Sequence, residues 1–237
     1  MFLTYEQKSL IERVLNVFET GTPTGKYYAI ARYNDGPHQI RQITYGRSQT
    51  TEYGNLRQLI SDYADANGTL SAELKPYVAK IGVVPLVEDE TLMGLLKEAG
   101  RNDPVMKTVQ DAFFDRVYFA PAMRWADENG FVLPLSGLII YDSFIHSGQI
   151  FWFLRKRFTE VPPGQQGDER KWTKSYVEVR NQWLKDHTRA DVRASAYRTR
   201  DLLAQVNAGN WYLSETPILA NGVNVNPLPN PYPLAGP

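Results

Sequence analysis

The sequence of 237 residues contains no cysteine. This absence excludes disulfides, thiolate metal sites and cysteine nucleophiles, but it leaves the cellular compartment open. An excess of charge is missing as well, because 26 basic residues balance 26 acidic ones. Without a net positive field, the composition gives no reason to expect nucleic acid or an anionic membrane surface as a partner.

Long apolar runs are also absent. No window approaches the stretch of about 18 apolar residues that a membrane-spanning helix requires, so we expect no membrane insertion. The first ten residues, MFLTYEQKSL, lack the basic region followed by an apolar stretch that marks a secretory signal. Two interpretations remain open: a cytoplasmic protein, or an exported protein whose signal has been removed.

The sequence does not match several common functional motifs, because the residues that they require are absent or wrongly spaced. The three histidines, His38, His146 and His187, are far apart and form no pair with metal-ligand spacing, so we predict neither a metal site nor a cofactor. Residues 21–26, GTPTGK, have too few residues between the glycines for a phosphate-binding loop, and Tyr27 follows the lysine. No GxSxG elbow occurs. Arginines around 180–200 alternate with acidic residues, which favours an ion-paired helix face over a nucleic-acid surface.

Helical spacing of apolar residues dominates what is present. Residues 4–19 are predicted to form an amphipathic helix with Thr4 as its N-cap, stopped by Gly21 and Pro23. Further helices are expected over 53–63, 71–80, between the loop 83–90 and the turn 102–104, over 105–129 with a break at Pro121, and over 134–147, 169–185 and 189–208. Short alternating segments between 27 and 51, with a turn at 34–36, predict strands.

These elements predict an α+β, mostly α-helical protein with a small β-element near the N-terminal third. We expect a single domain of two lobes over residues 1–237. Residues 213–237 are rich in proline and are expected to form an extended C-terminal tail with little secondary structure.

Two carboxylates flank the predicted β-element. Glu19 ends the first helix beside Phe18, where desolvation and the helix dipole favour a protonated carboxyl group, as a general acid requires. Taken alone, it is more readily explained as a solvated residue at a frayed helix end. Asp35 precedes Gly36, which taken alone indicates turn chemistry. Together they can lie on opposite walls of a cleft, the arrangement that hydrolysis of a glycosidic bond requires.

A third carboxylate, Asp142, lies inside the predicted helix 134–147, which is apolar on most sides. A buried carboxylate needs a cationic partner. Arg180 and Arg198, in the two arginine-rich helices that follow, are the candidates.

Six short segments share a wider pattern. They are VFETG at 17–21, DG at 35–36, TYGR at 44–47, DRVYFAPA at 115–122, the YD, H and G of 141–148, and the GDE, W and VR of 167–180. In this order they resemble the chitosanases of glycoside hydrolase family 46, over about residues 4–212. The resemblance implies a lysozyme-like fold with a substrate cleft between two lobes. It also implies a secreted, monomeric endo-hydrolase of β-1,4 bonds in chitosan, the polymer of glucosamine, without a cofactor.

The resemblance also implies residue roles. Glu19 would be the general acid, Asp35 the general base, and Thr44 would help to hold the attacking water. Members of the family invert the anomeric centre, which needs carboxyl groups about 6.5–9.5 Å apart. Asp142 would bridge Arg180 and Arg198 into a network that orients Glu19. Residues expected to contact the substrate are Tyr45, Arg47, Glu52, Asn55 and His146.

The chain departs from the family pattern at two places. Between Asp35 and Thr44 it reads GPHQIRQI, which is longer than the family's segment. Asn55 stands where the family has an aspartate that holds a glucosamine ammonium, and an amide offers no ion pair. Glu52, three residues earlier, can take over that charge. Two alternatives therefore stay open: a hydrolase of another aminosugar polymer such as peptidoglycan, and a catalytically silent glycan-binding protein.

Overall fold

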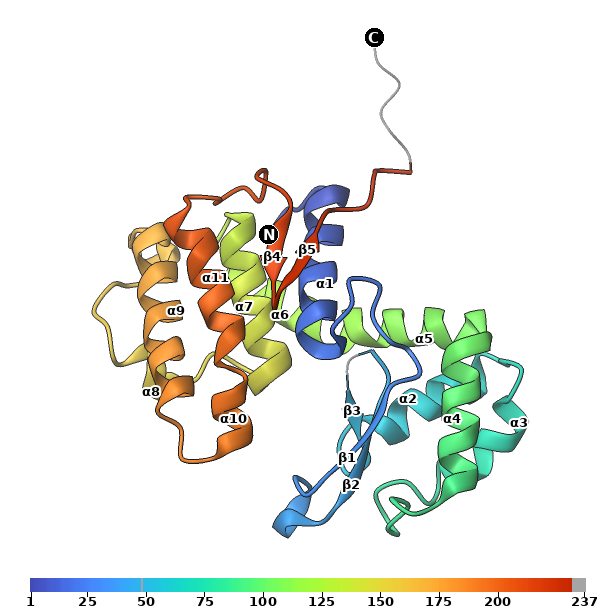
Figure 1. The fold of residues 1–237 in the computed structure, drawn as a ribbon. Coiled ribbons are helices and arrows are strands. Elements are labelled where there is room, and N and C mark those ends of the chain that lie inside the picture. The colour runs from blue at the N-terminus through green and yellow to red at the C-terminus, as the bar shows by residue number, and fades with distance from the viewer. Residues whose placement is uncertain (48, 232–237) are drawn as a thin grey trace. The chain divides into compact units, whose positions relative to one another are not determined.

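The structure, a computed structural model, describes residues 1–47 and 49–231. Helices dominate these residues and the strands are short (Figure 1), so the prediction of an α+β, mostly helical protein is confirmed. The chain divides into two compact units. Unit 1 combines Met1–Pro23 with the chain from Val117 onward, and unit 2 is Thr24–Arg116. None of the helices within the described residues is long and apolar enough to span a bilayer.

Unit 1 begins with α1, Tyr5–Thr20, close to the predicted helix. Its N-terminus carries a capping box, in which the Thr4 hydroxyl accepts from the Gln7 N–H and the Gln7 side chain accepts from the Thr4 N–H. Its C-terminus stops at Gly21, whose φ of 76° places it in the left-handed region that glycine tolerates. The turn directly before this stop carries Glu19.

The rest of unit 1 is mainly helical. Its helices are α6 (Ala120–Glu128), α7 (Pro134–Ser147), α8 (Trp152–Arg155), α9 (Glu169–Lys185), α10 (Ala190–Ala194) and α11 (Ala196–Asn207), with a 3₁₀ turn η4 (Pro163–Gln165). Helix α7 is buried from Pro134 to Ser143, as its apolar sequence predicts. Helix α11 packs along α9, and both contact α7 (Figure 1). The predicted helix 189–208 is divided at Ser195 into α10 and α11.

The C-terminal part of unit 1 contains two short strands. Strands β4 (Ile218–Ala220) and β5 (Val223–Val225) form an antiparallel hairpin that packs against α1 (Figure 1). The stretch expected to be an extended tail with little secondary structure therefore folds back on itself here. The two connecting residues, Asn221 and Gly222, have φ of 44° and 80°. An Asn-Gly pair with positive φ at both positions is the preferred turn of a tight hairpin. Residues 232–237 of the predicted tail lie outside the described residues.

Unit 2 contains the small sheet. Strands β1 (Ile30–Tyr33), β2 (Gln42–Tyr45) and β3 (Thr50–Thr51) are antiparallel in the order β1-β2-β3, and Tyr33 is opposite Gln42. A 3₁₀ turn, η1 (Pro37–Gln39), lies between β1 and β2. The remaining elements of the unit are α2 (Leu56–Asp65), α3 (Ser71–Leu74), η2 (Lys75–Tyr77), α4 (Glu90–Asn102) and α5 (Pro104–Phe114).

The long helix predicted over 105–129 is interrupted earlier than expected. A π-helical segment, η3 (Asp115–Phe119), separates α5 from α6. Pro121 lies in the first turn of α6, where the missing N–H of proline costs no helical hydrogen bond. The break therefore precedes the proline.

Candidate active site

Helix α11 carries a buried arginine that contacts two carboxylates. Arg198 is 3% exposed. Its Nη1 donates to Glu19 Oε1 at 2.6 Å, and its Nε and Nη2 lie 2.8 and 2.6 Å from Asp142 Oδ1. Burial by itself would lower the pKa of Arg198, but Asp142 and Glu19 outweigh burial and raise it. One guanidinium thus fixes two carboxylates from two other helices.

Asp142 is fully buried in α7 and has a second cationic partner. Arg180 of α9, 1% exposed, donates from Nη1 to Asp142 Oδ2 at 2.5 Å. Burial would raise the pKa of Asp142, but the guanidinium groups of Arg198 and Arg180 outweigh it and lower the pKa to about 2. The structure therefore brings Asp142, Arg180, Arg198 and Glu19 into one ion-pair network.

Glu19 is held at the end of α1 by more than its own ion pair. The Tyr197 hydroxyl of α11 donates to the carbonyl oxygen of Phe18 at 2.7 Å, and the Arg198 guanidinium lies 5.2 Å from the centre of the Phe18 ring. The Glu19 side chain is 13% exposed, so its carboxyl group is fixed but still reaches solvent. A positioned carboxyl group with restricted water access is suited to proton transfer.

His146 lies one turn after Asp142 in α7. Burial, followed by the positive charges of Arg180 and Arg198, lowers the pKa of His146 to about 3. Its ring is therefore neutral near pH 7, and Nδ1 lies 3.2 Å from Ser147 Oγ. His146 can exchange hydrogen bonds with a ligand but does not offer it a charge.

The second predicted carboxylate, Asp35, follows β1 in unit 2 and is exposed. Its Oδ1 accepts from Gln42 Nε2 at 2.9 Å, and Gln42 is itself 4% exposed on β2. The Gln42 Oε1 accepts from the Tyr53 N–H at 3.1 Å, which fixes the amide on its other side. Asp35 is thus oriented through one oxygen and open to water around the rest of the group.

The additional residues after Asp35 form a loop whose two ends are joined by a hydrogen bond. The Gly36 N–H donates to the Ile40 carbonyl at 3.0 Å, across the η1 turn. A Cβ on Gly36 would lie 2.7 Å from that same carbonyl oxygen, so the turn needs a glycine. Because the loop closes at its base, Gln42 is brought back to Asp35 despite the longer segment. Thr44, two residues after Gln42, lies on the same face of β2; its Oγ1 donates to the Ala31 carbonyl at 3.3 Å.

Two of the predicted substrate contacts, Tyr45 and Glu52, have partners within the protein instead. Tyr45 is fully buried and donates to the Leu96 carbonyl at 2.7 Å. Glu52 is 1% exposed and accepts from the N–H groups of Ile43 and Leu86 at 3.1 and 2.7 Å. These burials contradict a direct contact of Tyr45 or Glu52 with substrate.

The other two predicted contacts in unit 2 differ in accessibility. The Arg47 side chain is 6% exposed, pairs with Asp111 and lies 4.8 Å from the centre of the Phe114 ring. Asn55 is partly exposed at the start of α2. Asn55 is therefore the more accessible of the two to a ligand.

The residues of the predicted site thus fall into two groups, one in each unit. Unit 1 holds the network of Glu19 with His146 nearby, and unit 2 holds Asp35 with Gln42 and Thr44. The pairing of Glu19 with Asp35 stays a prediction. Within the described part of the chain, no three His, Asp or Glu side chains are grouped to hold a metal ion.

Sequence reasoning missed Gln42 and Tyr197. Gln42 was detectable in principle, because it alternates with Thr44 along a predicted strand. Tyr197 had no such signal, since its role depends on where α11 meets the end of α1.

The chain as a whole is similar to known chitosanases. A curated chitosanase of Bacillus subtilis (strain 168) is 28% identical over 234 residues, covering 91% of this chain and 82% of the relative. The structure of a GH46 chitosanase from Gynuella sunshinyii in complex with chitotetraose has a TM-score of 0.78 at 27% identity, covering 97% of this chain and 100% of that one. A mutant chitosanase from Bacillus subtilis MY002, complexed with 6 GlcN, has the same fold, with a TM-score of 0.77 at 24% identity and coverage of 94% and 98%.

The sequence profile described as glycosyl hydrolase family 46 matches residues 13–218. This range includes Glu19, Asp35 and the Asp142 network, and it covers most of the chain. The chain therefore belongs to glycoside hydrolase family 46.

Proposed function

We propose that the protein is an endo-acting, inverting chitosanase with Glu19 as its general acid and Asp35 as its general base. Family membership makes the chain a glycoside hydrolase. The observation that carries the assignment of the acid is the contact of Glu19 with the buried guanidinium of Arg198, which Asp142 holds in turn. A binding protein without catalysis would not need so strongly oriented a carboxyl group.

In the proposed reaction, Glu19 gives its proton to the glycosidic oxygen of the leaving sugar. Asp35 takes a proton from a water molecule, which attacks the anomeric carbon from the opposite face. The exposure of Asp35 on all but its Gln42 side supports this role, because the attacking water needs room beside the base. Thr44, on the same strand face as Gln42, would help to position that water. A single displacement inverts the anomeric centre, so a β-linkage gives an α-product.

Chitosan is the proposed substrate, supported by the chitosanases to which the chain is similar. A polymer of this kind is too large to enter a cell, and we accordingly place the enzyme's action outside it. Asn55 favours a second candidate, an aminosugar polymer with fewer ammonium groups such as peptidoglycan, because its side chain offers a sugar amine no ion pair.

The test is release of reducing ends from highly deacetylated chitosan and from peptidoglycan in parallel, with product anomers followed by NMR. Release from chitosan with α-anomers first would establish the proposed function. β-Anomers as first products would contradict the inverting roles of Glu19 and Asp35. Activity on peptidoglycan alone would mean that the same residues hydrolyse the second candidate substrate instead of chitosan. Saturable polymer binding without new reducing ends would identify a silent binding protein.

A further inference from the structure

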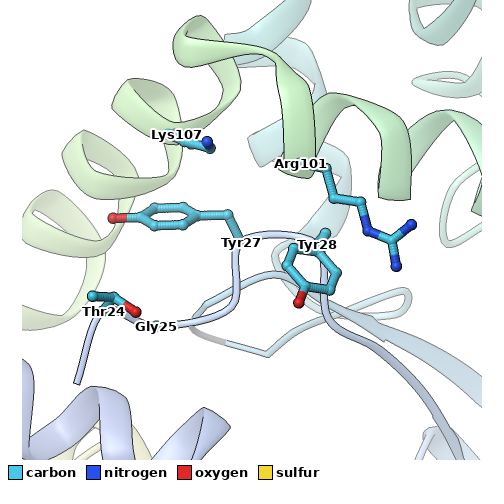
Figure 2. A pocket seen from close by; sticks show the side chains of 7 residues that line it. Thr24, Gly25, Tyr27, Tyr28, Arg101 and Lys107 are labelled. Carbon is cyan, nitrogen blue, oxygen red and sulfur yellow. The ribbon is translucent and has the colours of Figure 1, made fainter. Parts of the chain in front are cut away.

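Unit 2 contains a pocket of about 270 Å³ that the proposed reaction does not use (Figure 2). Its walls come from the loop Thr24–Tyr28 before β1, the C-terminal end of α4 and the first half of α5. Strand β1 separates this loop from Asp35, which follows the other end of the strand. Four strand residues span about 10–13 Å, so the pocket and Asp35 are distinct places in unit 2.

Two cationic side chains line the pocket without a carboxylate partner. Arg101 of α4 and Lys107 of α5 form no ion pair in the described part of the chain, and Arg101 instead lies 4.6 Å from the centre of the Tyr28 ring. The acidic groups one turn away are engaged elsewhere. Asp111 accepts from the Tyr27 hydroxyl and pairs with Arg47, and Glu98 accepts from Asn102. The pocket therefore presents two cationic side chains for which no ion pair with a carboxylate is found among the described residues.

Tyr27, which lines the pocket, is held in place by hydrogen bonds within the protein. Its carbonyl oxygen accepts from the buried Gln110 Nε2 at 2.8 Å, and its hydroxyl donates to Asp111 at 2.9 Å. A Cβ on Gly100 would lie 2.4 Å from the Tyr27 carbonyl oxygen, so the loop rests directly on the backbone of α4. A wall held at these points loses little conformational freedom when a ligand binds.

The shape and the aromatic lining suggest what kind of anion would fit. Figure 2 shows the Tyr27 ring between Thr24 and Lys107 in this view, with Arg101 beside Tyr28. Tyrosine rings present an apolar face together with a polar tip, which suits the C–H face of a sugar. The volume is below the range of about 300–1,000 Å³ typical for drug-sized ligands, which matches a single sugar ring.

We propose that this pocket binds an acidic monosaccharide unit, a sugar ring that carries a carboxylate or a phosphate, separately from chitosan cleavage. Arg101 and Lys107 hold the acidic group through charge-assisted hydrogen bonds. The Tyr27 ring supports the sugar ring, and the Thr24 hydroxyl is available for a sugar hydroxyl. Glucosamine, which is cationic at neutral pH, is repelled by the same two side chains, so the pocket is not a subsite for chitosan.

The test is an NMR titration of the full chain with glucuronate and with glucose 6-phosphate, the two sources of the acidic group. Glucose, glucosamine and inorganic phosphate serve as comparison ligands. We expect at least one acidic sugar to bind about tenfold or more tightly than each comparison ligand. Arg101→Gln and Lys107→Gln should each weaken that binding by about tenfold. The exposed Lys75, outside the pocket, provides the matched control Lys75→Gln, which should bind as the wild type does.

Because Arg101 and Lys107 lie on the surface of their helices, melting temperatures should stay unchanged and confirm that the variants fold. Equal binding of inorganic phosphate and the acidic sugars would overturn the proposal, because the sugar ring would then contribute nothing. Absence of binding, or binding that survives both substitutions, would overturn it as well. None of these readouts depends on whether the protein cleaves chitosan, so failure of the proposed function would be recognised separately.

Discussion

Arg198 joins Glu19 to Asp142 through a single guanidinium, with contacts of 2.6 Å on both sides. In the proposed reaction, Glu19 acquires a negative charge as it gives up its proton. Arg198 is already in place to stabilise that charge, and Asp142 keeps Arg198 from turning away. Preorganised charge of this kind lowers a barrier because nothing has to reorient during the reaction.

The first prediction concerns Glu19 itself. Glu19→Gln should lower chitosan hydrolysis by about 10²- to 10⁴-fold, the range that general acid–base catalysis contributes, because the amide has no proton to donate at neutral pH. Polymer binding and melting temperature should change little, since the amide oxygen can still accept from Arg198. Reducing-end release and a polymer co-sedimentation assay measure the two effects.

Glu12→Gln is the matched control, because Glu12 is on the same helix and pairs with Lys8 at 3.5 Å in a partly exposed position. It should keep wild-type activity. Unchanged activity of Glu19→Gln would exclude Glu19 as the acid.

The second prediction concerns the buried ion pairs. Asp142→Asn removes the charge that Arg180 and Arg198 share, and an unpaired buried charge costs about 3–5 kcal/mol. We expect urea unfolding to show a loss of this order and hydrolysis to fall, because Arg198 no longer has a fixed position beside Glu19. Asp186→Asn, on the exposed end of α9, is the control and should leave both quantities unchanged.

The same residue predicts an acid-dependent part of the stability. The pKa of Asp142 is lowered from 3.8 to about 2 on folding, so the unfolded chain binds its proton first as the pH falls. The stabilisation, about 2 kcal/mol, is present above pH 4 and is lost between about pH 4 and pH 2. The difference in unfolding free energy between wild type and Asp142→Asn should shrink over this interval. A constant difference would mean that Asp142 is not ionised beside the arginines.

Some of this architecture was predictable from the sequence, and the reason is physical. The capping residues of α1 act through neighbours three positions away, so Thr4 and Gln7 indicate the start of the helix locally. Asp142 in an apolar helix demands cationic partners whatever the fold, and the two arginine-rich helices that follow it in the sequence could supply them.

Other features depend on contacts that no local pattern encodes. All four residues of β2 are buried, so the sequence did not show which face of the strand is the core, where Tyr45 lies, and which face carries Gln42 and Thr44. The prolines of the tail obscured the Asn221-Gly222 signal for the hairpin. Glu52 satisfies the N–H of Leu86, a residue 34 positions later.

The third prediction uses His146. The pKa of His146 is lowered from 6.5 to about 3 on folding. Between pH 6.5 and pH 3, the histidine is therefore protonated in the unfolded state and neutral in the folded state. The stability that the neutral ring contributes is present above pH 6.5 and declines as the pH falls, by up to about 2 kcal/mol at pH 5.

His146→Gln removes this titration, so its unfolding free energy should depend less on pH between 7 and 5 than that of the wild type. His38→Asn, in the exposed turn after β1, serves as the comparison variant, and asparagine tolerates the φ of 54° at this position. Parallel curves for wild type and His146→Gln would contradict a partly buried histidine that stays neutral.

The fourth prediction separates structure from substrate binding at Glu52. Glu52→Gln replaces one of two oxygens that accept from backbone N–H groups, leaving a buried donor unsatisfied at a cost of about 1–3 kcal/mol. The melting temperature should fall, whereas KM for chitosan should stay the same. Glu88→Gln, a surface residue paired with Arg32 and Arg41, should change neither. A raised KM at unchanged stability would restore Glu52 as a substrate contact.

The last prediction concerns substrate choice at Asn55, and it depends on the proposed function. Asn55→Asp places a carboxylate on a partly exposed position at the start of α2. An ion pair with a sugar ammonium at such a position is worth up to about 1 kcal/mol, so KM for highly deacetylated chitosan should fall by up to about fivefold.

KM for a partly acetylated polymer should change less, because an acetylated amine carries no charge. Added salt should diminish the gain, since exposed ion pairs are screened. The opposite charge in Asn55→Lys provides the matched control and should raise KM for deacetylated chitosan. If KM is the same in both variants, Asn55 does not face the sugar amine, and the preference for glucosamine has to arise from other residues.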